Sequence, residues 1–359
     1  MASIYGHDVP GEIPWFDADR DEALVCRQVR AETPDVKTFL FSARAPRLFR
    51  FLPGQFLTFE FPLPDGPVRR CYTISSSPTR PLLVSITVKR VPGGPVSNWL
   101  HDSMKPGLEV PVSGPMGEFT ASLHPARKYL FLSGGSGITP LMSMARAAHD
   151  LSAETDILFL HSARSPADII FRTELGLIER NLPGFRAVSI CEEDSPSERW
   201  SGPRGRLSLP LLQLFAPDFK EREVFTCGPT PYMAAVRALL DQAGFDRAHY
   251  HEESFVFAEA TEPAAAPQQL AAGGFKITFT KSNRVVDCPA DGFVLDAARR
   301  AGLRLPSSCT KGLCGTCKSK MLSGQVDMKH GGGIREREID QGMVLICCSK
   351  PLSDLVIEK

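Results

Sequence analysis

The sequence lacks the features that mark membrane proteins, secreted proteins and nucleic-acid-binding proteins. No run of about 18 apolar residues occurs in the 359 residues, and the first residues hold no basic stretch followed by an apolar one. Lys plus Arg and Asp plus Glu both total 41, so no overall basic field exists to attract nucleic acid or anionic lipid. We therefore expect a cytoplasmic protein with neither a nucleic-acid partner nor a membrane partner.

Cysteine, by contrast, is plentiful, and four of the ten cysteines have a distinctive spacing near the C-terminus. Cys309, Cys314 and Cys317 form C-x4-C-x2-C, and Cys347 follows after 29 further residues. This is the plant-type arrangement for a [2Fe-2S] cluster. Structural zinc also accepts four thiolates, but its ligands usually come as two short pairs. The spacing thus predicts single-electron chemistry in a reducing compartment, with zinc as the open alternative.

The length of the chain predicts two or three domains, and changes in local composition and apolar periodicity indicate where they divide. Short β-like runs separated by Pro- and Gly-rich turns predict a small all-β barrel, after which strands and helices alternate as in a doubly wound α/β domain. A segment rich in Ala, Pro, Gln and Gly then reads as a linker. The expected divisions are an N-terminal tail 1–20, the barrel 21–122, the α/β domain 123–256, the linker 257–274 and a last domain 275–359.

Helices are expected within the last two domains at positions set by apolar spacing. Those of the α/β domain should lie near 138–149, 167–181 and 230–243. In the last domain a strand, a turn at Ser282 and Asn283, and a second strand precede a helix that Asp291 is expected to cap.

The barrel segment RRCYTISSSP alternates a cation, an aromatic ring and hydroxyls along one strand. Its period of two places Arg70 and Tyr72 on the same face. Arg70 can hold a phosphate, Tyr72 can lie against a flat ring, and Thr73 and Ser75 offer hydroxyls. An ordinary strand with an exposed arginine fits the same residues, so this segment alone leaves both interpretations open.

Two glycine-containing segments look like phosphate seats. Gly94 and Ser97 open an expected helix, where free backbone N–H groups favour a pyrophosphate. A second seat, Gly134, Gly135 and Gly137, lies where a strand meets a helix. It departs from G-x-G-x-x-G, because Pro140 stands in the place of the third glycine.

Together with VPVSGPMGEF near the end of the barrel, these segments resemble the ferredoxin-NADP reductase superfamily. The resemblance implies a six-stranded antiparallel flavin-binding barrel, a nicotinamide-binding α/β domain and a C-terminal β-grasp ferredoxin domain. It implies that Arg70, Tyr72, Thr73, Ser75, Gly94 and Ser97 bind the flavin, with Val88 and Lys89 near its ribose and phosphate. It further implies a nicotinamide crevice at Thr139, Cys227, Gly228 and Pro229, with Glu253 and Phe255 near the flavin; Thr73, Cys227 and Phe255 are the candidate catalytic residues.

The order of the three domains is similar to the reductase components of Rieske-type oxygenase systems, as in phthalate dioxygenase reductase-like proteins. The flavin of that type is FMN, whereas GGPVSNWLHD is closer to FAD-binding relatives, so FAD is expected. VLICCSKPLSDLVI resembles the closing segment of plant-type ferredoxins, which implies that Cys347 is the fourth ligand and Cys348 a buried thiol. DMKHGGGIREREIDQGM resembles reductases that serve oxygenases demethylating quaternary amines such as glycine betaine.

The expected function is therefore the transfer of electrons from NAD(P)H through FAD and a [2Fe-2S] cluster to a terminal Rieske-type oxygenase. Arg164 and Arg172 suit a 2′-phosphate whereas Asp168 repels one, and we expect NADH rather than NADPH. A hybrid-cluster-protein-type NADH oxidoreductase and a non-catalytic electron-transfer or redox-sensing subunit remain alternatives. Lysines beside the cluster loop are candidates for steering an acidic partner, namely Lys311, Lys318 and Lys320.

Overall fold

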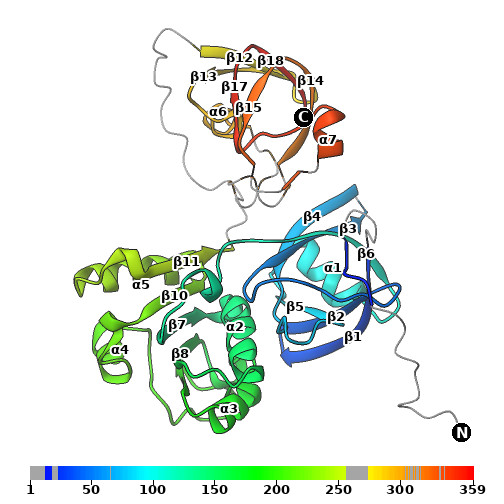
Figure 1. Cartoon of the computed structure of the whole chain (residues 1–359). Coiled ribbons are helices and arrows are strands. Elements are labelled where there is room, and N and C mark those ends of the chain that lie inside the picture. Colours follow the sequence, from blue (N-terminus) through cyan, green and yellow to red (C-terminus); the bar gives the residue numbers. More distant parts are fainter. Residues whose placement is uncertain are drawn as a thin grey trace, which may run out of the picture. The chain divides into compact units, whose positions relative to one another are not determined.

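The structure, a computed structural model, describes residues 13–17, 23–64, 66–255, 274–303, 305, 307, 310, 312, 315, 317–330, 333–334 and 336–359. These residues form two compact units, the first built mainly from the chain up to Phe255 and the second from the C-terminal residues (Figure 1). Among the described residues, no helix combines the length and the apolar character that a membrane span requires.

The first unit begins with the predicted six-stranded antiparallel barrel. Its strands follow the order β4-β3-β6-β1-β2-β5, and a bridge between Ile74 and Ile86 joins the end of β4 to β5. Alternate residues such as Phe39, Phe41 and Phe59 fill its interior, as the period of two requires. The elements are β1 (Ala23–Thr33), β2 (Val36–Ala43), β3 (Phe56–Leu63), β4 (Gly66–Thr73), β5 (Val84–Lys89), α1 (Pro95–Ser103) and β6 (Glu109–Met116).

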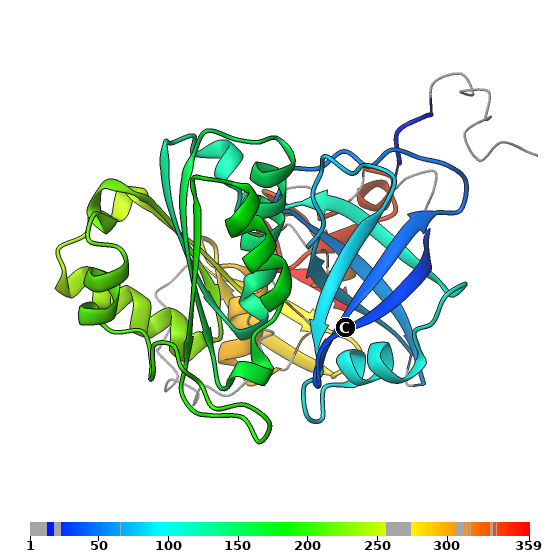
Figure 2. The same cartoon turned by 90° about the horizontal axis from the view of Figure 1, so that it is seen from below.

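A parallel five-stranded sheet follows, which confirms the predicted doubly wound domain. Its strands β7 (Lys128–Gly134), β8 (Asp156–Ala163), β9 (Phe185–Cys191), β10 (Glu223–Gly228) and β11 (Tyr250–Ser254) have the order β11-β10-β7-β8-β9. Both faces are covered: α2 (Ile138–Asp150) and α3 (Arg172–Asn181) lie on one, α4 (Leu209–Phe215) and α5 (Thr230–Gln242) on the other (Figures 1 and 2). Strand alternation explains this, since Phe131 and Phe159 face α2 and α3 whereas Leu130 and Leu160 face α4 and α5.

Two of the three helices predicted here are confirmed, but the third begins later than expected. The segment expected to be helical from 167 contains a short 3-10 turn, η3 (Pro166–Asp168), and α3 starts at Arg172. The interruption is Phe171, whose φ of 58° lies in the left-handed region and cannot continue a right-handed helix. Other 3-10 turns of the first unit, also three residues long, are η1 (Ala121–Leu123), η2 (Gly135–Gly137), η4 (Phe219–Glu221) and η5 (Arg247–His249).

The C-terminal unit is the predicted β-grasp domain. Its sheet has the order β13-β12-β18-β14-β16, with β12 and β18 parallel, and β15 pairs with β17 beside it. Its elements are β12 (Gly274–Phe279), β13 (Arg284–Pro289), α6 (Val294–Arg300), β14 (Lys318–Ser323), β15 (Val326–Met328), α7 (Glu336–Asp340), β16 (Met343–Leu345), β17 (Ser349–Pro351) and β18 (Leu355–Glu358).

Two details of this domain differ from the prediction. Asp291 does not cap the helix: α6 has Phe293 at its N-cap position, without a side-chain hydrogen bond. Gly274, expected to end the linker, already pairs with Pro289 in β12, while 257–273 lie outside the described residues. The turn predicted at Ser282 and Asn283 is confirmed, and Asn283 supplies it with a φ of 49°.

Candidate nucleotide, flavin and iron–sulfur sites

The carboxyl ends of β7 and β10 meet at a very close backbone approach. A Cβ atom added to Gly137 would lie 2.3 Å from the carbonyl oxygen of Cys227 and 2.5 Å from the nitrogen of Gly228. Only glycine fits there, so the Gly-rich turn η2 rests directly on the Cys-Gly-Pro segment. Ligands of doubly wound sheets bind at such carboxyl ends. The structure thus brings together four residues predicted for the nucleotide, Gly134, Gly137, Cys227 and Gly228.

Tyr232, which the sequence analysis missed, lies across the same strand ends from the first turn of α5. A Cβ on Gly134 would meet its Cγ at 2.9 Å, and one on Gly228 would meet its Cδ1 at 2.7 Å. The ring is half-buried, whereas the hydroxyl is inaccessible and burial raises the pKa of Tyr232. The available signal was an aromatic residue three positions after Pro229 at a helix start, opposite two glycines. Tyr232 therefore forms part of the crevice wall.

Cys227 is fully buried. Burial, and to a smaller extent the negative charge of Glu253, raises the pKa of its thiol well above the usual value. Register pairing places Cys227 beside Glu253 on β11. The thiol is therefore protonated and suits contact with a flat ring rather than attack as a nucleophile. Phe255, which follows the carboxyl end of β11, packs against the core cluster that includes Cys227.

The remaining nucleotide residues shape the turns around the crevice. The hydroxyl of Thr139, which is buried, donates to the carbonyl of Ser136 at 3.2 Å and holds the glycine turn. Gly135 has a φ of 50° with open space where a Cβ would stand, and Pro229 precedes the first residue of α5.

Both arginines considered for a 2′-phosphate already have carboxylate partners. Arg164 donates to Asp168 at 2.8 Å, and Arg172 makes a two-pronged contact with Glu198 at 2.6 and 2.8 Å. Asp168 also accepts from the hydroxyl of Ser165 at 2.7 Å. Burial would raise the pKa of Asp168, but Ser165 and Arg164 lower it overall, so Asp168 is an anion at neutral pH.

A second group missed by the sequence analysis is His161, which is fully buried on β8. Its Nδ1 lies 2.7 Å from the hydroxyl of Ser133, the register partner on β7, and burial lowers the pKa of His161 to about 4. No pattern in the sequence separates it from the apolar residues of that strand. His161 is therefore a neutral imidazole. It lies one residue before the last paired position of β7 and β8, next to the crevice.

On strand β4, Tyr72, the residue predicted to lie against the flavin ring, is half-buried. Tyr72 packs edge-on to Phe59 and Phe61, with ring centroids 6.2 and 6.0 Å apart, and Thr73 beside it is buried. Arg70 is partly exposed and donates to the carbonyl of Arg69 at 2.8 Å.

Ser75, also predicted to bind the flavin, makes hydrogen bonds inside the barrel. Its hydroxyl is fully buried and lies 2.9 Å from that of Ser85 and 3.0 Å from that of Thr87. These hydrogen bonds engage the Ser75 hydroxyl inside the barrel. They hold in place the strand that carries Tyr72 and Thr73.

At the predicted pyrophosphate site, the hydroxyl of Ser97 holds the turn before α1 through hydrogen bonds. The hydroxyl of Ser97 accepts from the nitrogen of Val91 at 3.1 Å and donates to the carbonyl of Gly94 at 3.2 Å. A Cβ on Gly94 would meet that hydroxyl at 2.8 Å. The first turn of α1 holds no acidic residue, so its backbone N–H groups suit a phosphate and the seat fits the flavin nucleotide.

Val88 and Lys89, expected near the ribose and phosphate, have partners within the first unit. The carbonyl of Val88 lies 2.9 Å from Nε2 of His101, and Nζ of Lys89 lies 3.2 Å from Asp35. The Val88 side chain is buried, so this residue offers no side-chain contact to a ligand.

In the C-terminal domain, Cys317 and Cys347 are buried, whereas Cys309, Cys314 and Lys311 lie outside the described residues. A Cβ on Gly312, which has a φ of 71°, would meet Sγ of Cys348 at 2.7 Å. Gly312 thus lies directly against the segment that holds Cys347.

Cys348 has a backbone partner of its own. Its thiol donates to the carbonyl of Leu345 at 3.5 Å, which suits the expected buried thiol. The two described lysines near the loop are also engaged: Lys318 pairs with Glu338 at 2.5 Å, and Lys320 donates to the carbonyl of Gln341.

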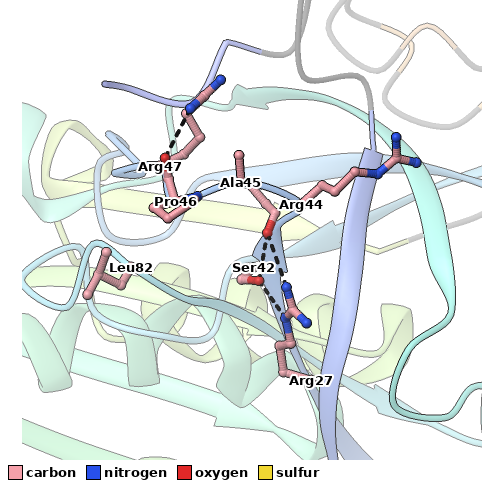
Figure 3. Close-up of a pocket in the computed structure, with 8 residues that line it drawn as sticks. Arg27, Ser42, Arg44, Ala45, Pro46, Arg47 and Leu82 are labelled. Atoms are coloured by element: carbon pink, nitrogen blue, oxygen red, sulfur yellow. Dashed lines mark hydrogen bonds between the residues drawn. The ribbon is translucent and has the colours of Figure 1, made fainter. Parts of the chain in front are cut away.

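A separate pocket of about 190 Å³ lies on the barrel (Figure 3). Arg27 donates to the hydroxyl of Ser42 at 2.7 Å, and Arg44 is paired with Glu109. None of the residues predicted for a cofactor lines this pocket, and its arginines bond within the barrel. The pocket is therefore apart from the candidate sites.

Three family models match successive parts of the chain. An oxidoreductase FAD-binding domain matches residues 24–121, an oxidoreductase NAD-binding domain 131–238, and a 2Fe-2S iron-sulfur cluster binding domain 277–352. These matches agree with the positions of the three candidate sites.

Relatives match over nearly the full length. A glycine betaine monooxygenase reductase subunit of Pseudomonas aeruginosa is 49% identical over 343 residues, covering 93% of this chain and 94% of the relative. The stachydrine N-demethylase reductase subunit Stc4 of Rhizobium meliloti is 41% identical over 347 residues, covering 96% and 97%. The structure of phthalate dioxygenase reductase is similar with a TM-score of 0.58 and 26% identity, covering 95% of this chain and 98% of that one.

Proposed function

The chain belongs to the family of oxygenase reductase subunits that join FAD-binding, NAD-binding and [2Fe-2S] domains, and we propose that it passes electrons from NADH to a terminal Rieske-type oxygenase. It is an NAD(P)H-dependent oxidoreductase whose FAD accepts two electrons together and whose cluster releases them singly. We place the reaction in the cytoplasm, because a reducing compartment protects cluster thiolates.

One observation carries this proposal: the nucleotide crevice and the end of β4, with Tyr72 and Thr73, lie in one compact unit of a chain that also holds the cluster domain. The contact of Gly137 with Cys227 prepares the crevice, and Tyr72 and Thr73 lie at the end of β4 in the same unit. A redox sensor that does not turn over nicotinamide has no need of such a crevice.

NADH is the proposed donor because of the charges after β8. Arg164 and Arg172 are occupied by Asp168 and Glu198, so a 2′-phosphate would have to displace a carboxylate at each arginine. Two carboxylates near a phosphate disfavour it by like-charge repulsion. A ribose with a free 2′-hydroxyl meets neither cost.

The proposed partner is an oxygenase that demethylates a quaternary amine. The support is that the relatives at 49% and 41% identity serve glycine betaine and stachydrine systems, whereas the NADH oxidoreductase HCR of Escherichia coli is 32% identical. No residue of this chain is expected to contact the amine, which binds the partner.

The test is an anaerobic titration of iron-replete protein with NADH and, separately, NADPH, followed by the visible spectrum and low-temperature EPR. Bleaching of the flavin and a reduced [2Fe-2S] signal, faster with NADH, are expected. If neither centre is reduced, the sensor or carrier alternative replaces the reductase.

Three cysteine variants refine this test. Cys314→Ser should abolish cytochrome c reduction and leave ferricyanide reduction by the flavin, and equal loss of both would contradict the serial path. Cys347→Ser should remove the EPR signal, whereas the matched variant Cys348→Ser should keep it. Electron delivery to purified glycine betaine oxygenase or to a hybrid-cluster protein then separates the two partners.

A further inference from the structure

Helix α2 carries the glycine turn at its start and a polar face toward the barrel farther along. Ser143 donates to the carbonyl of Ser76 at 2.7 Å, and Arg146 donates to the carbonyl of Ser75. Asp150 accepts from Arg80 at 2.6 and 2.9 Å. Positions 143, 146 and 150 share one side of a helix, so α2 binds one continuous barrel segment with a single face.

That barrel segment continues directly from the flavin strand. Ile74 and Ser75 follow Thr73, and they close the barrel through the bridge of Ile74 to Ile86 and the bond from the Ser75 nitrogen to Ser85, 2.8 Å long. Neither residue can shift without moving the end of β4. A contact to the Ser75 carbonyl therefore acts on the backbone two residues beyond Thr73.

Arg146 is the buried charged residue among these α2 contacts, with 6% of its surface exposed. Two of its nitrogens bond to the carboxylate of Glu174 at 2.7 and 2.6 Å, and its guanidinium lies 4.5 Å from the centre of the Phe171 ring. The carboxylate fixes the guanidinium plane, which leaves the third nitrogen aimed at Ser75. This geometry uses all three nitrogens of one planar group.

We infer that Arg146 is a positioning residue for hydride transfer: it holds the flavin strand against the helix whose first turn forms the nucleotide crevice. This rests on the proposed function, in which one proton and two electrons leave NADH together for FAD and NAD⁺ remains. Gly137 at the N-cap of α2 and the Arg146 contact belong to the same helix, so the helix sets the separation of the two reacting rings.

The variant Arg146→Lys tests this, because a lysine keeps the charge but cannot span the carboxylate and the Ser75 carbonyl in one plane. Arg222 provides a matched control. It is 7% exposed, bonds Asp156 at 2.8 and 2.9 Å and Asp218 at 2.8 and 3.0 Å, and donates to the carbonyl of Tyr129 at 3.2 Å. Its chemistry matches, yet it lies at the amino ends of the strands.

Both variants are compared as full-length protein with saturating FAD. Arg146→Lys and Arg222→Lys should lower the melting temperature similarly, but only Arg146→Lys should slow flavin reduction by NADH, by about tenfold or more. The KM for NADH and the rate from photoreduced flavin to the cluster should stay near wild type. Independently of turnover, hydrogen exchange in peptides covering 74–80 should accelerate in Arg146→Lys alone.

Equal rates of flavin reduction in the two variants, or unchanged exchange at 74–80 in Arg146→Lys, would overturn the inference. Should Arg146→Lys yield no folded protein, Ser143→Ala carries the test with the same readouts, because it removes one hydroxyl contact to Ser76. Failure of the wild-type protein to reduce its flavin with NADH would instead sink the proposed function, so the two failures are distinguishable.

Discussion

Replacing Gly137 with alanine should damage hydride transfer through a steric effect with a known direction. The φ of Gly137 is −65°, which alanine adopts without strain, so no backbone cost confuses the result. The new Cβ would stand 2.3 Å from the carbonyl oxygen of Cys227 and 2.4 Å from its carbonyl carbon. Neither atom belongs to a flexible side chain, so the glycine turn and the end of β10 must separate.

The size of that separation sets the expected loss. A relaxed contact between a Cβ and a carbonyl oxygen is longer than 2.3 Å by about 1 Å, and a displacement of about 1 Å at a reacting site costs on the order of 10²-fold in rate. Overpacking of this kind also costs about 1–3 kcal/mol in the free energy of unfolding. We therefore expect flavin reduction by NADH to slow about 10²-fold in a protein that still folds and binds FAD.

Anaerobic stopped-flow measurement of flavin bleaching checks this, with dithionite as a reductant that bypasses the crevice. Gly176→Ala is the control, because its Cβ would meet nothing closer than Nη1 of Arg180 at 3.7 Å on α3. An alanine there should leave the rate unchanged and stabilise the helix by roughly 0.5–1 kcal/mol. A Gly137→Ala rate within twofold of wild type would refute the close approach on which the crevice is built.

Three further substitutions test separate features. Burial lowers the pKa of His161 to about 4 from 6.5, so the unfolded chain takes up a proton first as pH falls. The free energy of unfolding of the wild type should therefore fall by about 2 kcal/mol between pH 7.5 and 5, and His161→Gln should not show this fall. Identical urea unfolding profiles of the two proteins would contradict this. Burial would raise the pKa of Asp150, but hydrogen bonds from Arg80 and Thr79 lower it to about 2. The stabilisation that Asp150 gives above pH 3.8 is therefore lost as pH falls toward 2, and Asp150→Asn should remove this loss of stability in acid unfolding experiments. Gly312→Ala should lower the iron-to-flavin ratio, because its Cβ meets Sγ of Cys348 at 2.7 Å, whereas Gly302→Ala at a similar φ with open space should not.

The sequence was sufficient for the three domains because each has a distinct periodicity. Short β-like runs between Pro- and Gly-rich turns predicted the barrel, and short apolar runs alternating with helical stretches predicted the doubly wound domain. The start of α3 was predicted too early, because the left-handed Phe171 is a tertiary feature. It packs under the guanidinium of Arg146, which comes from another helix.

Contacts between residues distant in sequence explain what was missed in the site. The turn glycines were evident as phosphate seats, but that Gly137 rests on Cys227 depends on the neighbouring positions of β7 and β10 in the sheet. Tyr232 was missed for the same reason, since its partners Gly134 and Gly228 come from two strands. Periodicity shows which face a residue occupies and does not show which strand end lies opposite.

The amino and carboxyl ends of the strands in the α/β sheet have different roles, and this limits where a substitution can change function. At the amino ends, Arg222 joins β7 and β8 through a carbonyl and a carboxylate, a purely stabilising contact. At the carboxyl ends, the approach of Gly137 to Cys227 leaves room for no added atom. Because β7, β8 and β10 are parallel, every substitution in this sheet lies nearer the amino ends or the carboxyl ends of the strands. Removing a contact at the amino ends should therefore lower the stability of the protein. Removing one at the carboxyl ends should slow flavin reduction in a protein that still folds.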